Sequence, residues 1–254
     1  MGALLVVMLA TAMMLVFSMA AIDASRSAPY RQSFCVTWRF NVDVNNLRDW
    51  KTVPKSCESY VGSYMNRGDF SQDASLAMME GVSFAHSVFN SSTTAGTDAF
   101  SYNAWVFDID DTSLSNLPYY AKHSFGAEAY NDTLFSAWTA KAICPPIHAT
   151  LDLFNSLKDL GFSIFFLTGR SESERNSTAT NLLGAGYSGW QGLILRQSED
   201  EGVRATLYKS AKRKSLEDLG YSIVGNVGDQ WSDITGYSVG SRTFKVPNPM
   251  YYIA

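Results

Sequence analysis

The sequence predicts an α/β fold in which a doubly wound, mostly parallel sheet follows a helical N-terminal region. Three observations lead to this fold class. Residues 34–90 have the apolar spacing of helices, and after about residue 100 short apolar segments alternate with amphipathic ones. The short segments are also apolar at nearly every position, which is typical of parallel strands buried on both faces.

The N-terminal part, residues 34–99, is expected to be helical and to contribute to a cap over the core. Pro54 can open a helix through "PKSCESYVGSYM", and "SQDASLAMMEGVSFAHSV" has helical apolar spacing with Ser71 as its N-cap. The Ser/Thr/Gly run at 91–97 then predicts a linker.

Residues 100–254 are expected to form the α/β core, with an insertion at about 112–144 over the end of the first strand. Pro145 and Pro146 start a helix whose apolar residues share one face, and Gly161 ends it. The predicted strands are 104–109, 162–168, 190–196, 222–228 and 242–246.

Net charge and the first residues bear on the partners and the cellular location of the chain. With 254 residues, a formal net charge of -4 and a pI near 5.4, a surface for nucleic acids is not expected. Residues 1–20 are uncharged, apolar and end in small residues, which predicts a secretory signal peptide cleaved at 20–28. A signal anchor is the alternative, because the stretch lacks Lys and Arg and is nearly long enough to span a bilayer. After cleavage no membrane association is expected.

Three cysteines follow the signal segment: Cys35, Cys57 and Cys144. An odd number in a secreted chain suggests one disulfide and one remaining thiol. Cys35 and Cys57 are the favoured pair because both lie in the N-terminal region, and three buried thiols are the alternative.

Three N-x-S/T sequons, at Asn90, Asn131 and Asn176, fit a secretory route as glycosylation sites. Asn90 lies in "NSSTTAGTD", which we expect to be a loop. Asn176 lies inside a predicted helix, which argues against its use.

The stretch "AWVFDIDDTSLSN" places acids directly after an apolar strand. Asp108 and Asp110 are two residues apart, so on a strand they point the same way, with Cα atoms about 6–7 Å apart. Carboxylates crowded at the end of a buried strand repel one another and lose solvation, so a cation should compensate them. A solvated Asp turn is the alternative.

The second strand ends in Thr168-Gly169. Gly169 allows close approach to the backbone, and Ser171 with Glu174 fits a capping box that begins a helix. A helix N-terminus preceded by a threonine hydroxyl predicts a phosphate-binding site at Thr168 and Gly169. The alternative is an ordinary helix start with Thr168 packed in the core.

The fourth strand leads into "GNVGDQWSD", with Asp229 and Asp233. Carboxylates from two strand ends meet at one sheet edge, and such oxygen ligands suit Mg²⁺. Asp229 is expected to bind the metal, whereas Asp233 is expected to hold the metal's surroundings or a lysine. Lys209, at the start of the preceding helix, is expected to balance the acids. An Asx turn with a helix cap is the alternative for the two acids.

Together these residues suit phosphoryl transfer to a carboxylate. Asp108 would attack phosphorus and form an aspartyl-phosphate, and Asp110 would act as acid and then base. Mg²⁺, Lys209, Thr168 and backbone amides would neutralise the phosphoryl oxygens.

The order of motifs FDIDDT, LTGR, YKS and GDQWSD resembles the haloacid dehalogenase (HAD) superfamily. More narrowly, the chain resembles plant acid phosphatases and vegetative storage proteins, through "FDIDDTSLSNLPYY", "LTGRSESER", "CVTWR", "DWKTVPKSC" and "FKVPNPMYYIA". The resemblance covers residues 34–254.

The resemblance implies a Rossmann-like core, a helical cap, Mg²⁺ dependence and hydrolysis of phosphomonoesters; family relatives also suggest a homodimer. One departure is Asp111, where many relatives carry Glu. Matched by position, the family roles fall on Asp108 (nucleophile and metal ligand), Asp110 (acid/base, with its carbonyl as metal ligand), Thr168 and Lys209 (phosphate) and Asp229 (metal).

The sequence leaves other functions to consider beside a phosphatase. A vegetative storage glycoprotein with vestigial phosphatase activity is the alternative function. In either case we expect the mature protein to be secreted or vacuolar. Dehalogenation needs no acid such as Asp110 for the leaving group. Phosphonate cleavage would need a Schiff-base lysine in the cap, where Lys122 and Lys141 have no further support.

Overall fold

A computed structural model describes residues 33–94 and 102–254 of the chain. The predicted signal peptide and its cleavage region lie outside these residues. Within the described ranges, no helix combines the length and the apolar character needed to cross a membrane.

The centre of the molecule is one five-stranded sheet with the order β3-β2-β1-β4-β5. Every neighbouring pair is parallel, which confirms the predicted doubly wound parallel sheet. Each predicted strand is present, with somewhat different ends. The strands are β1 (Asn103–Phe107), β2 (Ser163–Ser171), β3 (Gly192–Arg196), β4 (Ser222–Gly228) and β5 (Arg242–Lys245).

The strand order places a topological switch point next to β1. The chain runs from β1 outwards through β2 and β3, then returns to the other side of β1 for β4 and β5. Phe107, the last residue of β1, is in register with Phe166 of β2 and Val227 of β4. In such sheets ligands bind beyond the carboxyl ends of the strands at the switch point, which here follows Phe107.

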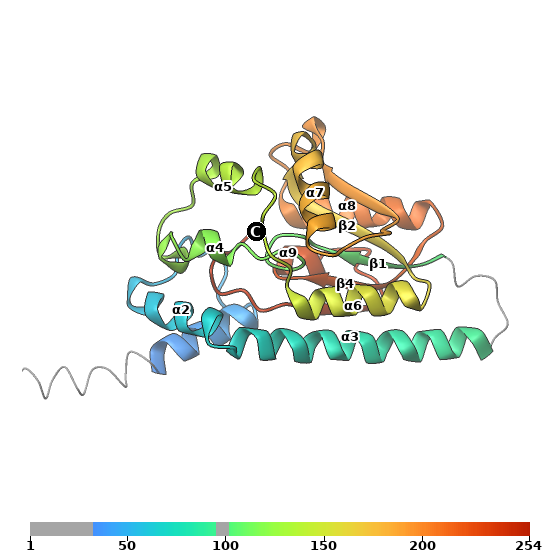
Figure 1. Ribbon diagram of the computed structural model, residues 1–254, viewed down its shortest axis with the longest axis horizontal. Coiled ribbons are helices and arrows are strands. Elements are labelled where there is room, and N and C mark those ends of the chain that lie inside the picture. The colour runs from blue at the N-terminus through green and yellow to red at the C-terminus, as the bar shows by residue number, and fades with distance from the viewer. Residues whose placement is uncertain (1–32, 95–101) are drawn as a thin grey trace, which may run out of the picture.

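Helices cover both faces of the sheet (Figure 1). On one face, Trp105 and Phe107 of β1 belong to the large apolar core that also contains residues of α3 and α6. On the other face, Ala104 and Val106 join a smaller cluster with residues of α8. The longer helices are α2 (Glu58–Asn66), α3 (Asp69–Thr94), α6 (His148–Asp159), α7 (Arg175–Gly184) and α8 (Ala205–Asp218).

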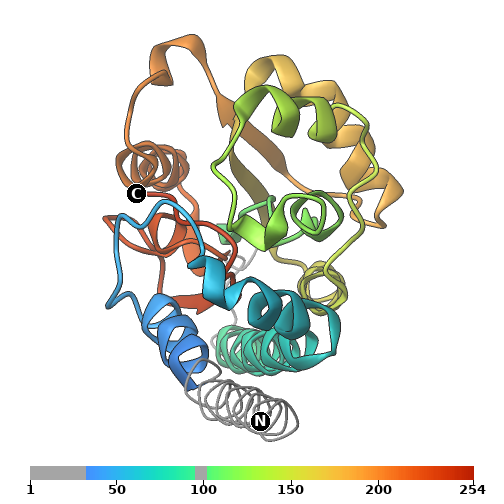
Figure 2. The same ribbon diagram turned by 90° about the vertical axis from the view of Figure 1, so that its left-hand side faces the viewer.

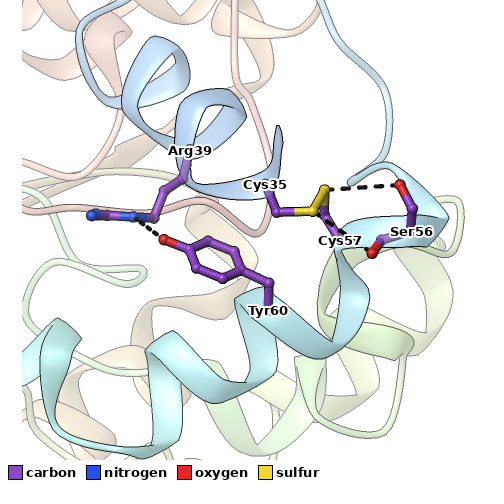
Figure 3. The surroundings of a disulfide bond; sticks show 5 residues. All are labelled: Cys35, Arg39, Ser56, Cys57 and Tyr60. Atoms are coloured by element: carbon purple, nitrogen blue, oxygen red, sulfur yellow. Dashed lines mark hydrogen bonds between the residues drawn. A yellow bond between two sulfur atoms is a disulfide. The ribbon is translucent and has the colours of Figure 1, made fainter. Parts of the chain in front are cut away.

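The N-terminal region is helical at 33–43, α2 and α3. The long helix α3 packs along α6, so this part of the region covers the sheet (Figure 1). A disulfide with an S–S distance of 2.00 Å joins Cys35 to Cys57, the pair favoured from the sequence, and ties the first helix to the start of α2 (Figure 3). Beside it, Arg39 Nε donates to the Tyr60 hydroxyl at 3.1 Å. Cys144 is free and buried.

The prediction of a loop around Asn90 is wrong. Helix α3 continues to Thr94, so Asn90 and the first residues of the expected linker at 91–97 are helical. The Ser/Thr run lowers helix propensity only slightly, and the first helix breaker in this stretch is Gly96. Residues 95–97 lie outside the described part of the chain.

The expected insertion at 112–144 contains only short elements: α4 (Leu117–Tyr120), a 3₁₀ turn at Ser124–Gly126 and α5 (Asp132–Thr139). Figure 2 looks onto the molecule from the side where these green segments lie. The rings of Tyr120 and Tyr251 stack with centroids 5.2 Å apart, which joins α4 to the C-terminal segment.

The core predicts a large effect of Phe154→Ala. The Phe154 ring is fully buried, stacks on Phe166 with centroids 5.7 Å apart and meets Tyr187 edge-on. We expect the substitution to lower the free energy of unfolding by about 3–5 kcal/mol in urea titrations, because it removes apolar contacts and leaves a cavity. The matched control is Phe40→Ala, since Phe40 is 58% exposed, and its loss should stay within about 0.5 kcal/mol. Similar losses for both variants would contradict this assignment of the core.

Candidate active site

A pocket of about 620 Å³ lies beyond the carboxyl ends of β1, β2 and β4. Its polar floor includes Asp108, Asp110, Gly169, Lys209 and Asp229, which are five of the residues singled out from the sequence. Apolar and aromatic side chains supply much of the wall: Trp50, Tyr120, Tyr130, Phe135, Tyr251, Tyr252 and Ile253.

The first ion pair of the floor joins Lys209 to Asp108 and Asp233, and all three side chains are buried. Burial and the neighbouring charge of Asp233 raise the pKa of Asp108 well above its usual range, against the opposing effect of Lys209. Burial alone would lower the pKa of Lys209, but Asp108 and Asp233 outweigh it and keep the ammonium charged.

The sequence suggested that Lys209 begins its helix, and this prediction is wrong. Helix α8 starts at Ala205, so Lys209 lies in the second turn. Arg204, with φ -56° and ψ 141°, is the N-cap of α8. From the second turn the long Lys209 side chain still reaches the end of β1.

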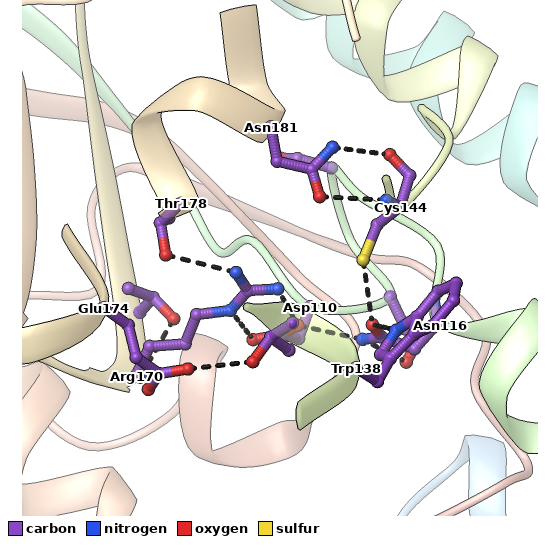
Figure 4. Close-up of polar contacts among 12 residues, drawn as sticks. Asp110, Asn116, Trp138, Cys144, Arg170, Glu174, Thr178 and Asn181 are labelled. Carbon is purple, nitrogen blue, oxygen red and sulfur yellow. Dashed lines mark hydrogen bonds and ion pairs between the residues drawn. The ribbon is translucent and has the colours of Figure 1, made fainter. Parts of the chain in front are cut away.

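The second ion pair joins Asp110 to Arg170 at the end of β2 (Figure 4). Arg170 donates from Nε to Oδ2 at 2.9 Å and from Nη2 to Oδ1 at 2.7 Å, and its Nη1 donates to Thr178 at 3.1 Å. Burial would raise the pKa of Asp110, but the charge and hydrogen bonds of Arg170 outweigh it and hold that pKa below its usual range. Asp108 and Asp110, two residues apart, therefore have pKa values shifted in opposite directions.

Asp229 follows β4 and has only neutral hydrogen-bond donors among the contacts of its carboxylate in the described structure. Oδ1 accepts from the Thr112 hydroxyl at 3.1 Å, and Oδ2 accepts from Gln230 at 2.6 Å and Asn248 at 2.7 Å. Burial and the charge of Asp233 raise the pKa of Asp229. The charge of Lys245 opposes this shift, but no Lys or Arg of the described structure forms an ion pair with Asp229.

Carboxylate oxygens of Asp108, Asp229 and Asp233 lie within 4.8 Å of one another. This buried donor set fits a hard divalent cation, whose charge would offset the repulsion that Lys209 and Lys245 leave between the three acids. Lys209 binds one oxygen of Asp108 and one of Asp233, and the second oxygen of Asp233 accepts from the Gln230 backbone N–H at 2.9 Å. The carbonyl oxygen of Asp110, also expected as a ligand, accepts from the Tyr251 hydroxyl at 3.4 Å.

A glycine is required at position 228, directly before Asp229. A Cβ at Gly228 would lie 2.3 Å from Cβ of Asp233, closer than side-chain atoms approach. The close approach lets α9 (Trp231–Ile234) turn back so that Asp233 reaches Lys209.

Thr168 and Gly169 occupy different positions at the end of β2. Gly169 is exposed and lines the pocket. Thr168 is fully buried, its hydroxyl accepts from the Arg170 backbone N–H at 3.1 Å, and it is not among the lining residues. The predicted capping box at Ser171 and Glu174 is formed, although the first turn is a 3₁₀ turn, Glu172–Glu174, that precedes α7.

The asparagines of all three sequons, Asn90, Asn131 and Asn176, are exposed. Asn131 is the N-cap of α5, where its side chain accepts from the Leu134 backbone N–H at 3.1 Å, and it is adjacent to the pocket residues Tyr130 and Asp132. Asn176 lies in the first turn of α7, within a helix as expected.

Several residues that had no predicted role form hydrogen bonds with the acids after β1 and β4. The position of Arg170 at the end of β2, in the motif LTGR, could have predicted that it contacts the acids. Asn116 and Asn248 had no such signal, since polar residues in loops usually face water, yet both are buried here. Tyr251 donates to Asp111 at 3.0 Å from a segment far along the chain.

The parallel sheet, the switch point and the carboxylates after β1 and β4 define a HAD-type α/β protein. The model of the HAD superfamily, subfamily IIIB (acid phosphatase), matches residues 19–254, and the chain belongs to this family. Phosphatases of this superfamily typically use a divalent metal, in agreement with the buried acidic group.

Relatives include both enzymes and storage proteins. The chain is 45% identical over 219 residues to Acid phosphatase 1 of Solanum lycopersicum, covering 86% of this chain and 83% of that one. It is 36% identical over 221 residues to Vegetative storage protein 2 of Arabidopsis thaliana, covering 86% and 80%. The class C acid phosphatase of Bacillus anthracis shares the fold, with a TM-score of 0.58, 20% identity and coverage of 77% and 85%.

The Asp110–Arg170 pair predicts a stability effect of Arg170→Met. The substitution leaves the partly buried Asp110 carboxylate without its counter-charge, and we expect the free energy of unfolding at neutral pH to fall by about 3 kcal/mol. Arg175→Met is the matched control, because Arg175 pairs with Glu172 at the surface, where side-chain exposures are 41% and 37%. Its loss should be about 0–1 kcal/mol in the same urea titration. Equal losses would show that the Asp110–Arg170 pair does not stabilise the site.

Proposed function

We propose that this chain is a Mg²⁺-dependent acid phosphatase that hydrolyses small phosphomonoesters through an aspartyl-phosphate on Asp108. The observation that carries the proposal is the arrangement of two adjacent acids in the pocket floor. Asp108 is paired with Lys209, and Asp110 is paired with Arg170, so each acid has its own partner and its own electrostatic environment.

Asp108 is the nucleophile in this proposal. Lys209 binds its Oδ1, and the other carboxylate oxygen, Oδ2, is the one that can attack phosphorus. As the new P–O bond forms, the bond between phosphorus and the ester oxygen breaks. Lys209, together with backbone N–H groups near Gly169, would stabilise negative charge on the phosphoryl oxygens, and the Thr168 hydroxyl remains a predicted contributor.

Asp110 is the acid and base. It donates a proton to the leaving oxygen, and in the second half it takes a proton from the water that attacks the aspartyl-phosphate, which releases Asp108 and inorganic phosphate. The Arg170 pair favours the ionised form, which suits the base. For the acid role, acidic solution and the negative charge of a bound phosphoryl group favour the protonated form.

Asp108, Asp229 and the Asp110 carbonyl would hold Mg²⁺, with Asp233 beside them on Lys209. The ion would supply positive charge that stabilises the phosphoryl oxygens during transfer. A cation here would also favour the ionised forms of Asp108 and Asp229, whose pKa values burial raises.

A storage role is the second candidate function, favoured by relatives that include vegetative storage proteins. The two roles are compatible, because an abundant reserve protein can retain an active site. The intact pairs around Asp108 and Asp110 favour catalysis, and the turnover rate separates an enzyme from a reserve protein with vestigial activity.

We place the mature protein in the secretory pathway, either extracellular or vacuolar. The Cys35–Cys57 disulfide supports an oxidising compartment, and the exposed sequon at Asn131 supports glycosylation. Use of Asn90 and Asn176, and a homodimer, remain predictions from the sequence and the family.

Asp108→Asn should abolish turnover. An amide is a poor nucleophile, so we expect hydrolysis of p-nitrophenyl phosphate at acidic pH with Mg²⁺ to fall at least about 10⁴-fold. Asp152→Asn is the control, because Asp152 is an exposed residue of α6 away from the pocket, and it should keep wild-type kcat. Retained activity in Asp108→Asn, or no activity in the wild type with and without Mg²⁺, would refute the proposed mechanism.

Metal binding should be visible without turnover. If Mg²⁺ binds only the folded protein, a concentration near 100 Kd stabilises it by about 2.7 kcal/mol and raises Tm. In Asp229→Asn we expect this rise in Tm to be lost, with NaCl at equal ionic strength as the control for screening. An equal rise in wild type and variant, or none in the wild type, would place the metal elsewhere or exclude Mg²⁺.

A further inference from the structure

Asn116 is a fully buried polar residue beside the acid/base Asp110, and the proposed mechanism gives it no role. It follows the turn after β1 and directly precedes α4. Its backbone N–H donates to Asp111 Oδ1 at 2.8 Å, and its carbonyl accepts from the Tyr119 and Tyr120 backbone N–H groups. The backbone of Asn116 is therefore fixed to the same turn that carries the catalytic acids.

The Asn116 side-chain amide uses its whole hydrogen-bonding capacity within the protein (Figure 4). Nδ2 donates to Asp110 Oδ1 at 2.8 Å and to Asp111 Oδ2 at 3.2 Å. Oδ1 accepts from Trp138 Nε1 at 2.9 Å and from the Cys144 thiol at 3.5 Å. Reversing the amide would bring its oxygen against two carboxylates and its NH₂ against a donor.

Trp138 determines this orientation because an indole N–H can only donate. It therefore binds the amide oxygen of Asn116 and turns the NH₂ group towards Asp110. Trp138 itself belongs to α5, whose last residue, Thr139, donates from its hydroxyl to Glu174 Oε1 at 2.9 Å. Helix α5 is thus joined both to the Asp110 side chain, through Asn116, and to the start of α7.

Asp110 is consequently held from two directions. Oδ1 receives hydrogen bonds from Arg170 Nη2 and Asn116 Nδ2, whereas Oδ2 receives only Arg170 Nε among its contacts in the described structure. The carboxylate also lines the pocket, with 18% of the side chain exposed. Fixing Oδ1 on both sides leaves Oδ2 as the oxygen with a lone pair free to carry a proton to or from the substrate.

We infer that Asn116 is a positioning residue for Asp110, oriented by the indole N–H of Trp138 on α5. This inference rests on the proposed acid/base role of Asp110. Proton transfer depends on placement to within a fraction of an ångström, so loosening Oδ1 slows the step in which the leaving oxygen is protonated. That step matters most for esters whose leaving group is a strongly basic alkoxide.

The test compares two substrates in Asn116→Ser and Trp138→Phe. We would measure kcat/KM, which covers every step up to departure of the leaving group, for glycerol 2-phosphate and for p-nitrophenyl phosphate. We expect kcat/KM for the alkyl ester to fall roughly 10- to 100-fold in Asn116→Ser, and less in Trp138→Phe. For the nitrophenyl ester, whose leaving group needs little protonation, the fall should be less than about threefold.

Trp190→Phe is the matched control, because Trp190 packs on Phe166 in the core, outside the residues that line the pocket. It should leave the ratio of the two kcat/KM values unchanged. Thermal melting of each variant establishes that it is folded. If Asn116→Ser does not fold, Trp138→Phe, which keeps Asn116 and an aromatic ring, still decides the question.

Equal losses on both esters, or no loss on either, would overturn the inference and reduce Asn116 to a structural residue of the turn. A failure of the proposed function would look different. In that case the wild type would hydrolyse neither ester, or Asp108→Asn would remain as active as the wild type.

Discussion

The structure depends on compensating several carboxylates that are buried together at the carboxyl ends of β1 and β4. Asp108, Asp229 and Asp233 lie within one small volume, and Asp110 is two residues from Asp108. Removing an ion from water costs several kcal/mol even after relaxation, so this arrangement is stable only with cations close by. Lys209 comes from α8 and Arg170 from β2, which means that the sheet order and the packing of α8 are conditions for the site. Asp229 has no ion-pair partner in the described structure, and Lys245 offsets its charge only in part, which is the physical reason for a divalent cation.

The two ion pairs also make two neighbouring acids chemically different. Lys209 shares its charge between Asp108 and Asp233, while the Arg170 guanidinium binds both oxygens of Asp110. Adjacent acids whose environments push their pKa values apart are a general way to assign a nucleophile and a proton carrier. The insertion adds a further constraint, since Trp138 of α5 binds Asn116, which in turn binds Asp110. Changes in the insertion can therefore alter catalysis without touching the nucleophile.

Local sequence patterns were sufficient for the sheet and for the acids on its edge. Apolar runs predicted all five strands, and position after a strand predicted that Asp108 and Asp229 meet, because parallel strands end at one edge. Local patterns did not predict the features that tertiary packing determines. Helix α3 passes through Asn90 because nothing breaks it, and Lys209 acts from the second turn of α8. Asn116 and Trp138 are 22 residues apart, and no spacing rule predicts that a loop amide and a helix indole meet inside the protein.

The central claim is that Asp108 carries the phosphoryl group. It is tested most directly by mixing the protein with p-nitrophenyl phosphate and Mg²⁺, quenching rapidly in acid and reducing with borohydride, which converts an aspartyl-phosphate to homoserine. Peptide mass spectrometry then locates the converted residue. We expect homoserine at position 108 only when substrate is present. Steady turnover with Asp108 unmodified, or conversion at another acid, would contradict it.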